Sequence, residues 1–280
     1  MAGDETVYSA DPVLRSPGRF LAAARADLRA VPPSAWRMWL RGVQARHRQS
    51  RLGYAWLPVP ALATALTWVY LDDVRVVRFG DAGIPYLAYV LIGVVLWQTF
   101  TDALHAPLRR LGAARHVLTK ARLPHEAWLA AGALDVAFNL LVRLGVLAAV
   151  LVAAGTPVRG AIVLAPLGVL ALGVLGFAIG LALAPVGLLY DDVGEALTVA
   201  TGLWFFLTPV VYPWPSEIPG DSVIALNPVT PVLVTTRAWA TGAPGAEPAQ
   251  LAAVGAGAAA LLVAAWLVYR VARPHLVARL

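Results

Sequence analysis

The sequence predicts an all-α integral membrane protein with six transmembrane helices. Hydrophobic residues make up 59% of the 280 residues, charged residues make up only 14%, and the mean hydropathy is +0.70. This composition does not fit a soluble domain, which needs a charged surface around its core. Backbone groups in hydrocarbon must be satisfied within their own segment, so long uncharged runs predict helices rather than strands. The six runs are 54–71, 85–101, 127–154, 161–189, 197–211 and 251–271.

The distribution of basic residues predicts the orientation of the chain. With the N-terminus inside, 17 of the 22 Lys and Arg residues fall in cytoplasmic segments or at the inner end of the last span. Four fall in outer connections, and Arg143 lies within a span. Because positively charged loops stay on the cytoplasmic side, we expect both termini inside. The predicted location is the cytoplasmic (inner) membrane.

Basic and amphipathic segments precede the first span. After a polar leader over 1–16, we expect a short interfacial helix that Pro32 and Pro33 terminate. A second helix is expected over 34–50, with Ser34 as its N-cap, tryptophan on one face and arginine mostly on the others. Such a helix lies in the headgroup plane. It is either a membrane anchor, which composition favours, or a helix that gates an opening between protomers.

Two connections of the permease region, which we assign to 54–280, depart from simple loops. The cytoplasmic connection 102–126 contains a basic, helix-compatible stretch over 107–120, with Pro107 suited to a first helical turn. On the outer side, the run 197–211 covers only about 22 Å at helical rise and is followed by several prolines. We therefore expect broken, half-inserted helices over 208–230, which usually indicate a pathway. An ordinary loop with proline turns is the alternative.

Motifs for catalysis or metal binding are missing from the sequence. The single lysine, Lys120, does not stand in a phosphate-binding loop, so ATP hydrolysis by that route is excluded. The chain has no cysteine, and its five histidines show no metal-binding spacing. The net charge of +6 is explained by the inner-leaflet bias of basic residues, so no nucleic-acid partner is expected.

A polar ladder is predicted within the third span. Asp135, Asn139 and Arg143 are four residues apart and line one helix face, where Asn139 can bridge the two charges. Asp102 and Asp135 are the few intramembrane carboxylates that an ion-coupled carrier would use. A polar seam facing the protein interior is the more economical interpretation, and substrate contact by Arg143 is the alternative. Aromatic residues near span ends fit an interfacial belt better than sugar stacking.

Several short motifs follow one another in a specific order and spacing. They are the basic lead and Leu-Gly-Tyr-Ala-Trp over 46–56, Leu91-Ile92-Gly93 with Trp97, Leu118-Thr119-Lys120 with Leu123-Pro124, Tyr190-Asp191-Asp192-Val193, Thr208-Pro209-Val210-Val211-Tyr212 and Asn227-Pro228. From about Trp36 to Arg273 the chain thereby resembles the membrane subunit of type-2 ABC exporters in the polysaccharide and polyol-phosphate export family. That family exports lipid-linked O-antigen, capsule, teichoic acid or galactan. Two departures are Asp191-Asp192, where the family often has Arg-Asp, and Thr208, where it has serine.

The resemblance implies a homodimer that pairs with two copies of an ABC nucleotide-binding subunit. ATP and Mg would bind that subunit, and this chain would hold no cofactor and be no enzyme. The substrate would be a lipid-linked glycan or related cell-envelope polymer, and helix 34–50 would be an inner gate. Arginines near this gate suit a pyrophosphate, because guanidinium groups bind phosphate oxygens in a planar fork.

The resemblance also implies three sets of site residues. The inner gate and substrate pathway would contain Arg46, Arg48, Arg51, Tyr54 and Trp56. The outer gate would contain Thr208, Pro209, Tyr212 and Trp214. The ATPase would contact Arg109, Arg110, Arg115, Lys120, Pro124 and Glu126.

Other functions compatible with the sequence are a type-2 ABC permease for a drug or lipid and an ion-coupled secondary transporter. A membrane-embedded enzyme of envelope synthesis is less favoured.

Overall fold

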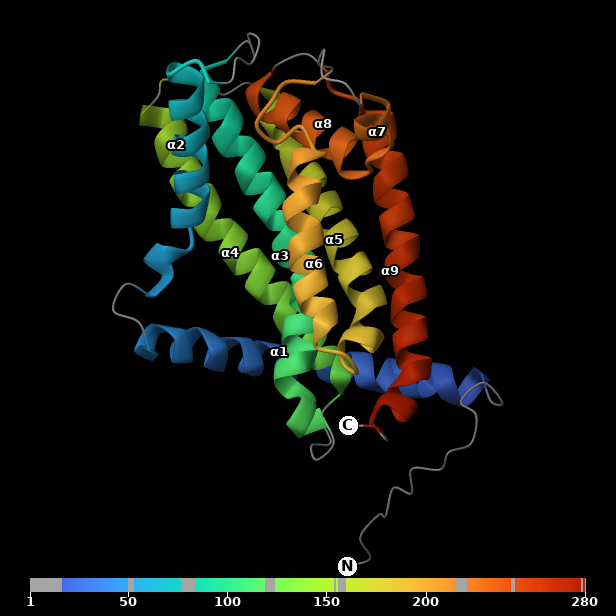
Figure 1. Cartoon of the computed structure of the whole chain (residues 1–280). Coiled ribbons are helices and arrows are strands. Elements are labelled where there is room, and N and C mark those ends of the chain that lie inside the picture. The colour runs from blue at the N-terminus through green and yellow to red at the C-terminus, as the bar shows by residue number, and fades with distance from the viewer. Residues whose placement is uncertain are drawn as a thin grey trace, which may run out of the picture.

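The computed structural model describes residues 17–49, 53–76, 84–118, 124–153, 155, 160–214, 221–242, 245–277 and 279. Within these ranges every regular element is a helix, as the sequence predicts. The long helices form an upright bundle, and one further helix crosses the bundle at one end (Figure 1).

Five helical stretches in the described part of the chain are long and apolar enough to cross a bilayer. They comprise η2 (Gly53–Trp56) with α2 (Val59–Asp73), α3 (Tyr86–Leu118), α4 (His125–Ala153), η3 (Gly160–Leu164) with α5 (Ala165–Gly187), and α9 (Pro248–Val277). They correspond to five of the six predicted spans.

The sixth predicted span, 197–211, contains the shorter helix α6 (Asp192–Phe206). This helix begins five residues before the predicted run and ends five residues before the end of that run. It stops because Pro209 has no N–H group and disfavours helical backbone at Thr208. Two short helices follow, α7 (Asp221–Leu226) and α8 (Val229–Thr241), and both lie near the end of the bundle opposite α1 (Figure 1).

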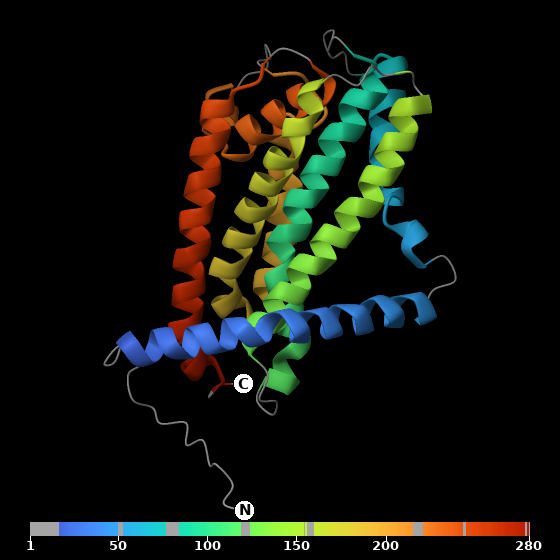
Figure 2. The same cartoon turned by 180° about the vertical axis from the view of Figure 1, so that it is seen from behind.

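The crossing helix is α1 (Pro17–Gln49), and it corrects the prediction of two helices separated by Pro32 and Pro33. Both prolines lie inside this continuous helix, so Ser34 is an interior residue and not an N-cap. A proline is compatible with helical φ but leaves one carbonyl without its donor. Here Pro32 and Pro33 are exposed, so water or lipid headgroups can satisfy those carbonyls. Figure 2 shows α1 extending across the foot of the bundle, where it packs against α4.

The structure also differs from the prediction of a separate basic helix over 107–120 that begins at Pro107. Pro107 lies inside α3, which continues without interruption to Leu118. Leu104 and Leu111, on either side of this proline, are fully buried. Their packing offsets the one backbone hydrogen bond that Pro107 removes. The basic stretch is therefore the end of a spanning helix.

The central helix is α3, which packs against α2, α4, α5, α6 and α8. Its contact with α5 is the closest, because Gly176 and Gly180 of α5 lie against the backbone of α3. A Cβ atom on these two glycines would collide with the carbonyl oxygens of Phe100 and Leu104. Small residues at such crossings let helix backbones approach in a membrane.

The first and last helices meet at the α1 end of the bundle. A carboxylate oxygen of Asp27 in α1 lies 2.7 Å from a guanidinium nitrogen of Arg270 in α9. The structure thus places both ends of the described chain at the α1 end of the bundle (Figure 1).

Substitution of Gly180 tests the α3–α5 crossing. We expect Gly180→Ala to lower the free energy of unfolding by about 1–3 kcal/mol, because its Cβ would overlap Leu104 and the Pro107 ring. Gly173→Ala on the same helix is the matched control, since a Cβ there meets nothing within 4 Å. Thermal unfolding of the purified chain in detergent measures the difference. Equal melting temperatures for the two variants would contradict this packing.

Candidate functional site

Residues 207–214, which directly follow α6, form an irregular turn that we call the capped turn. Thr208, Val210 and Val211 are almost fully buried, and Tyr212 is buried as well. Because this backbone is not helical, its carbonyl groups need donors from elsewhere. Four side chains supply them.

Two tyrosines of α3 donate hydrogen bonds to the capped turn. The Tyr86 hydroxyl lies 3.0 Å from the carbonyl oxygen of Val211, and the Tyr89 hydroxyl lies 2.9 Å from that of Tyr212. The Tyr212 hydroxyl in turn donates to the carbonyl of Phe206, the last residue of α6, at 3.0 Å. The two tyrosines are one helical turn apart, so one face of α3 holds two successive carbonyls.

Asn227, just before α8, connects the capped turn to two helices. Its amide nitrogen lies 3.1 Å from the Leu207 carbonyl oxygen and 2.8 Å from the Thr208 hydroxyl. Its amide oxygen accepts from the Trp204 indole and from the backbone N–H of Val229, both at 3.0 Å. All four contacts of this buried side chain serve to hold α6, the turn and α8 together.

Arg237 of α8 supplies the remaining donor. Its side chain is 4% exposed, and one guanidinium nitrogen lies 2.7 Å from the Val210 carbonyl oxygen. The guanidinium carbon lies 3.8 Å from the centre of the Tyr89 ring, which is cation–π geometry.

The predicted polar ladder of α4 pairs with α3 rather than along its own helix. Arg143 and Asn139 donate to the same carboxylate oxygen of Asp102, at 2.8 Å and 3.1 Å. Asp135 instead accepts from Arg110, whose Nε lies 2.8 Å away. The expectation that Asn139 bridges Asp135 and Arg143 is therefore wrong, because each charge finds a partner on α3 closer than the one two helical turns away.

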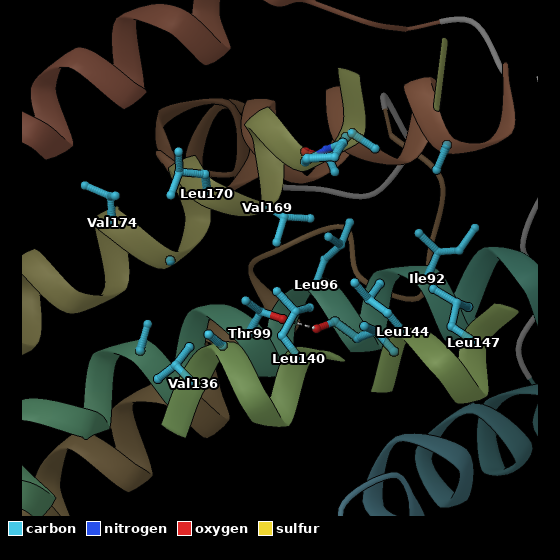
Figure 3. A pocket seen from close by; sticks show the side chains of 18 of the residues that line it. Ile92, Leu96, Thr99, Val136, Leu140, Leu144, Leu147, Val169, Leu170 and Val174 are labelled. Atoms are coloured by element: carbon cyan, nitrogen blue, oxygen red, sulfur yellow. Dashed lines mark hydrogen bonds between the residues drawn. The ribbon is translucent and has the colours of Figure 1, made fainter. Parts of the chain in front are cut away.

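A cavity of about 720 Å³ opens between α3, α4 and α5 (Figure 3). Among its lining residues only Thr99 and Thr236 have polar side chains. Their hydroxyls donate to the carbonyls of Val95 and Val232 within their own helices, at 2.8 Å and 2.6 Å. The cavity is thus suited to hydrocarbon and offers a glycan no polar partner.

Three of the six residues predicted to contact an ATPase form ion pairs within the described part of the chain, and one of them is Arg110, which pairs with Asp135. Arg115 lies 2.9 Å from Asp191, which stands where the family often has arginine. Glu126 is buried and pairs with Arg270, which also pairs with Asp27. Glu126 is therefore engaged inside the protein.

The other members of that set have simpler surroundings. Arg109 makes a long contact of 3.4 Å with the Asp102 carbonyl, and Pro124 directly precedes α4. Lys120 lies outside the described residues.

The predicted inner-gate residues lie around the end of α1. Arg46 and Arg48 belong to its last turn, and Arg51 lies outside the described residues. The Tyr54 hydroxyl donates to the Val43 carbonyl at 2.9 Å, and its ring packs edge-on against Phe138. Trp56 is 56% exposed, so its ring is available to a lipid or a partner.

Comparison with known proteins adds one relative and no family model. No protein-family model matches the chain. The O-antigen export system permease protein RfbA of Myxococcus xanthus is 28% identical over 231 residues, which cover 80% of this chain and 86% of that protein. The chain is a homologue of this export permease. The predicted resemblance to type-2 ABC export permeases is thereby confirmed.

The sequence predicts part of the capped turn and one of the residues that hold it, Asn227, which lies in the Asn227-Pro228 motif. Thr208, Pro209, Tyr212 and Trp214 were predicted at the outer gate, and all four lie in the capped turn. Tyr86, Tyr89 and Arg237 were not singled out. The signals available for them were a tyrosine pair spaced by three and an isolated arginine between two uncharged segments.

Removal of the Asn227 side chain tests the capped turn. Asn227→Ala leaves buried donors and acceptors unpaired, so we expect a loss of about 1–3 kcal/mol in the free energy of unfolding. Thr198→Ala, on the exposed face of α6 with only a local bond to the Gly194 carbonyl, is the control and should change little. Thermal unfolding in detergent measures both. A neutral Asn227→Ala would contradict the structural role of this residue.

A double-mutant cycle on Asp102 and Arg143 tests the polar seam. Arg143→Met leaves a poorly solvated carboxylate, so we expect it to destabilise the chain by roughly 3 kcal/mol. Adding Asp102→Leu removes that charge and should recover most of the loss. If the double variant is as unstable as the sum of the single variants, the pair is not the coupled unit that the distances indicate.

Proposed function

We propose that this chain is the transmembrane subunit of an ATP-driven ABC exporter that moves a lipid-linked polysaccharide or related envelope polymer across the cytoplasmic membrane. The observation that carries the proposal is the similarity to an O-antigen export permease along most of both chains. The sequence fits this division of labour, because it contains long apolar helices and no phosphate-binding loop. ATP and Mg would act on a separate partner subunit.

In this proposal two copies of the chain form the pathway. The cavity between α3, α4 and α5 is apolar, so a glycan would need a different, more polar route. A surface between two copies can provide that route. Aromatic side chains that are largely exposed on α2 and near α6, such as Tyr70, Tyr190 and Phe206, are available to line it or to face lipid.

The two ends of the bundle would have different tasks. The α1 end would be cytoplasmic, where Arg46, Arg48 and Arg51 would contact the lipid pyrophosphate and the end of α3 would receive the ATPase. The capped turn would be the outer gate, and the Arg115–Asp191 pair would tie the coupling region to the start of α6. In support, the end of α3, the start of α4 and the connection from α5 to α6 lie at the same end of the bundle (Figure 1).

One observation favours a different substrate for the same machinery. A lipid would fit the apolar cavity between α4 and α5, as the alternative of a lipid-moving ABC permease requires. No comparable observation favours an ion-coupled carrier, because Asp102 and Asp135 both form ion pairs with arginines of the same chain.

Reconstitution with a nucleotide-binding subunit tests the proposal. We expect the chain to co-purify as a dimer with two such subunits and to move a lipid-linked glycan in proteoliposomes only when ATP is supplied. Dissipation of proton and sodium gradients should leave this transport unchanged. Transport that persists without ATP and stops with the ion gradient would refute the proposal. ATP-dependent movement of unglycosylated lipid alone would favour the lipid permease.

A further inference from the structure

Arg237 presents a buried positive charge, and no carboxylate of the described residues pairs with it. None of the ion pairs within 4 Å in the described part of the chain includes Arg237. Its Nε is buried and has no hydrogen-bond acceptor there. Burial of an unpaired charge is costly, so its placement needs a specific reason.

Three elements meet at this guanidinium group. It belongs to α8, it lies over the Tyr89 ring of α3, and it donates to the Val210 carbonyl of the capped turn. The partner groups are thus a carbonyl dipole and the face of an aromatic ring. Both attract a cation, and neither replaces a counter-ion.

Gly93 of α3 makes room for this arrangement. A Cβ atom at Gly93 would collide with both the guanidinium of Arg237 and the carbonyl oxygen of Val210. Gly93 lies one turn beyond Tyr89 on the same helix. One side of α3 therefore presents both the Tyr89 ring and the space beside Gly93 to the guanidinium. Only a glycine at position 93 therefore leaves the space in which the Val210 carbonyl meets the Arg237 guanidinium.

We propose that Arg237 is a positioning residue that latches the capped turn onto α3 and α8 and keeps this end of the bundle closed to water. Release of the latch would hydrate the guanidinium, which recovers part of the solvation lost on burial. A charged latch of this kind fixes one closed position and still permits release. The inference rests on the proposed function only in naming the turn an outer gate.

The absence of cysteine from the chain permits a direct test of closure. Val211→Cys places a single thiol in the capped turn, where the native side chain is 2% exposed. The protein is placed in lipid nanodiscs, and the rate of modification by a charged, water-soluble maleimide is measured. We expect slow labelling in this background and at least about a tenfold faster rate when Arg237→Ala removes the charge-assisted hydrogen bond.

Three further variants separate a latch from general loosening. Gly93→Ala should accelerate labelling as well, because it displaces the guanidinium without changing Arg237. Arg237→Lys keeps the charge and should stay within about threefold of the background rate. Gly112→Ala, on the same helix with nothing within 4 Å of its Cβ, should have no effect.

A thiol at the other end of α3 is the control for global unfolding. The native Leu111 side chain is fully buried there. Labelling of Leu111→Cys should therefore remain slow in the Arg237→Ala background. Unchanged Val211→Cys labelling in both Arg237→Ala and Gly93→Ala would overturn the latch, as would an equal acceleration at Leu111→Cys. Because the readout is labelling without substrate or ATP, a failure of glycan export would refute the proposed function and leave this result standing.

Discussion

The constraint on which this structure depends is that backbone carbonyls in a low-dielectric environment need donors. Continuous helices satisfy the constraint by themselves, and this accounts for α2 to α5 and α9. At the capped turn the helix ends while the backbone is still buried. Side chains of α3, of α8 and of Asn227 just before α8 then replace the missing donors. Each of the carbonyls of residues 207, 210, 211 and 212 accepts from its own phenol, amide or guanidinium group. The arrangement of three helices around this turn follows from that requirement.

Charged residues satisfy the same constraint differently at the α1 end. There the buried groups are ion pairs, in which Arg270 joins Glu126 at the start of α4 to Asp27 in α1. Between the two ends, Asp102 and Arg143 join α3 to α4. Such pairs contribute little net stability, but removal of one partner is costly, so they fix the register of the helices they join. The α1 end is therefore held by ion pairs. The other end is held by hydrogen bonds to backbone carbonyls, one of which the guanidinium of Arg237 donates.

The extent to which the sequence predicts this fold differs between elements for physical reasons. Long uncharged runs identify five membrane-length helices, because length and hydropathy are local properties. Helix ends predicted from prolines were wrong at two places. Pro32 lies on an exposed face of α1, and Pro107 lies in a tightly packed part of α3. In both helices the surroundings offset a lost hydrogen bond, and the surroundings are not visible in a local pattern.

The candidate site shows the same division. Thr208 and Pro209 were predictable, because proline after an apolar run ends a helix wherever it occurs. Tyr89 and Arg237 were not, because their roles depend on contacts between residues far apart in the chain. The partners of Asp135 and Asn139 were missed for this reason as well, since a helical ladder specifies a face but not the charges on the facing helix.

The short length of α6 connects these observations to movement. Its 15 residues cover about 22 Å, less than the roughly 30 Å of hydrocarbon, so α6 alone is too short to cross a bilayer core. Opening a helix breaks consecutive backbone bonds together, whereas each side-chain cap of the turn can exchange its bond for one to water at a net cost of only about 0.5–1.5 kcal/mol. The end of the bundle at the capped turn can therefore rearrange while α3 and α5 stay intact. A helix that stops early thus provides a movable segment on a rigid scaffold, and the buried guanidinium of Arg237 lies at the contact between the two.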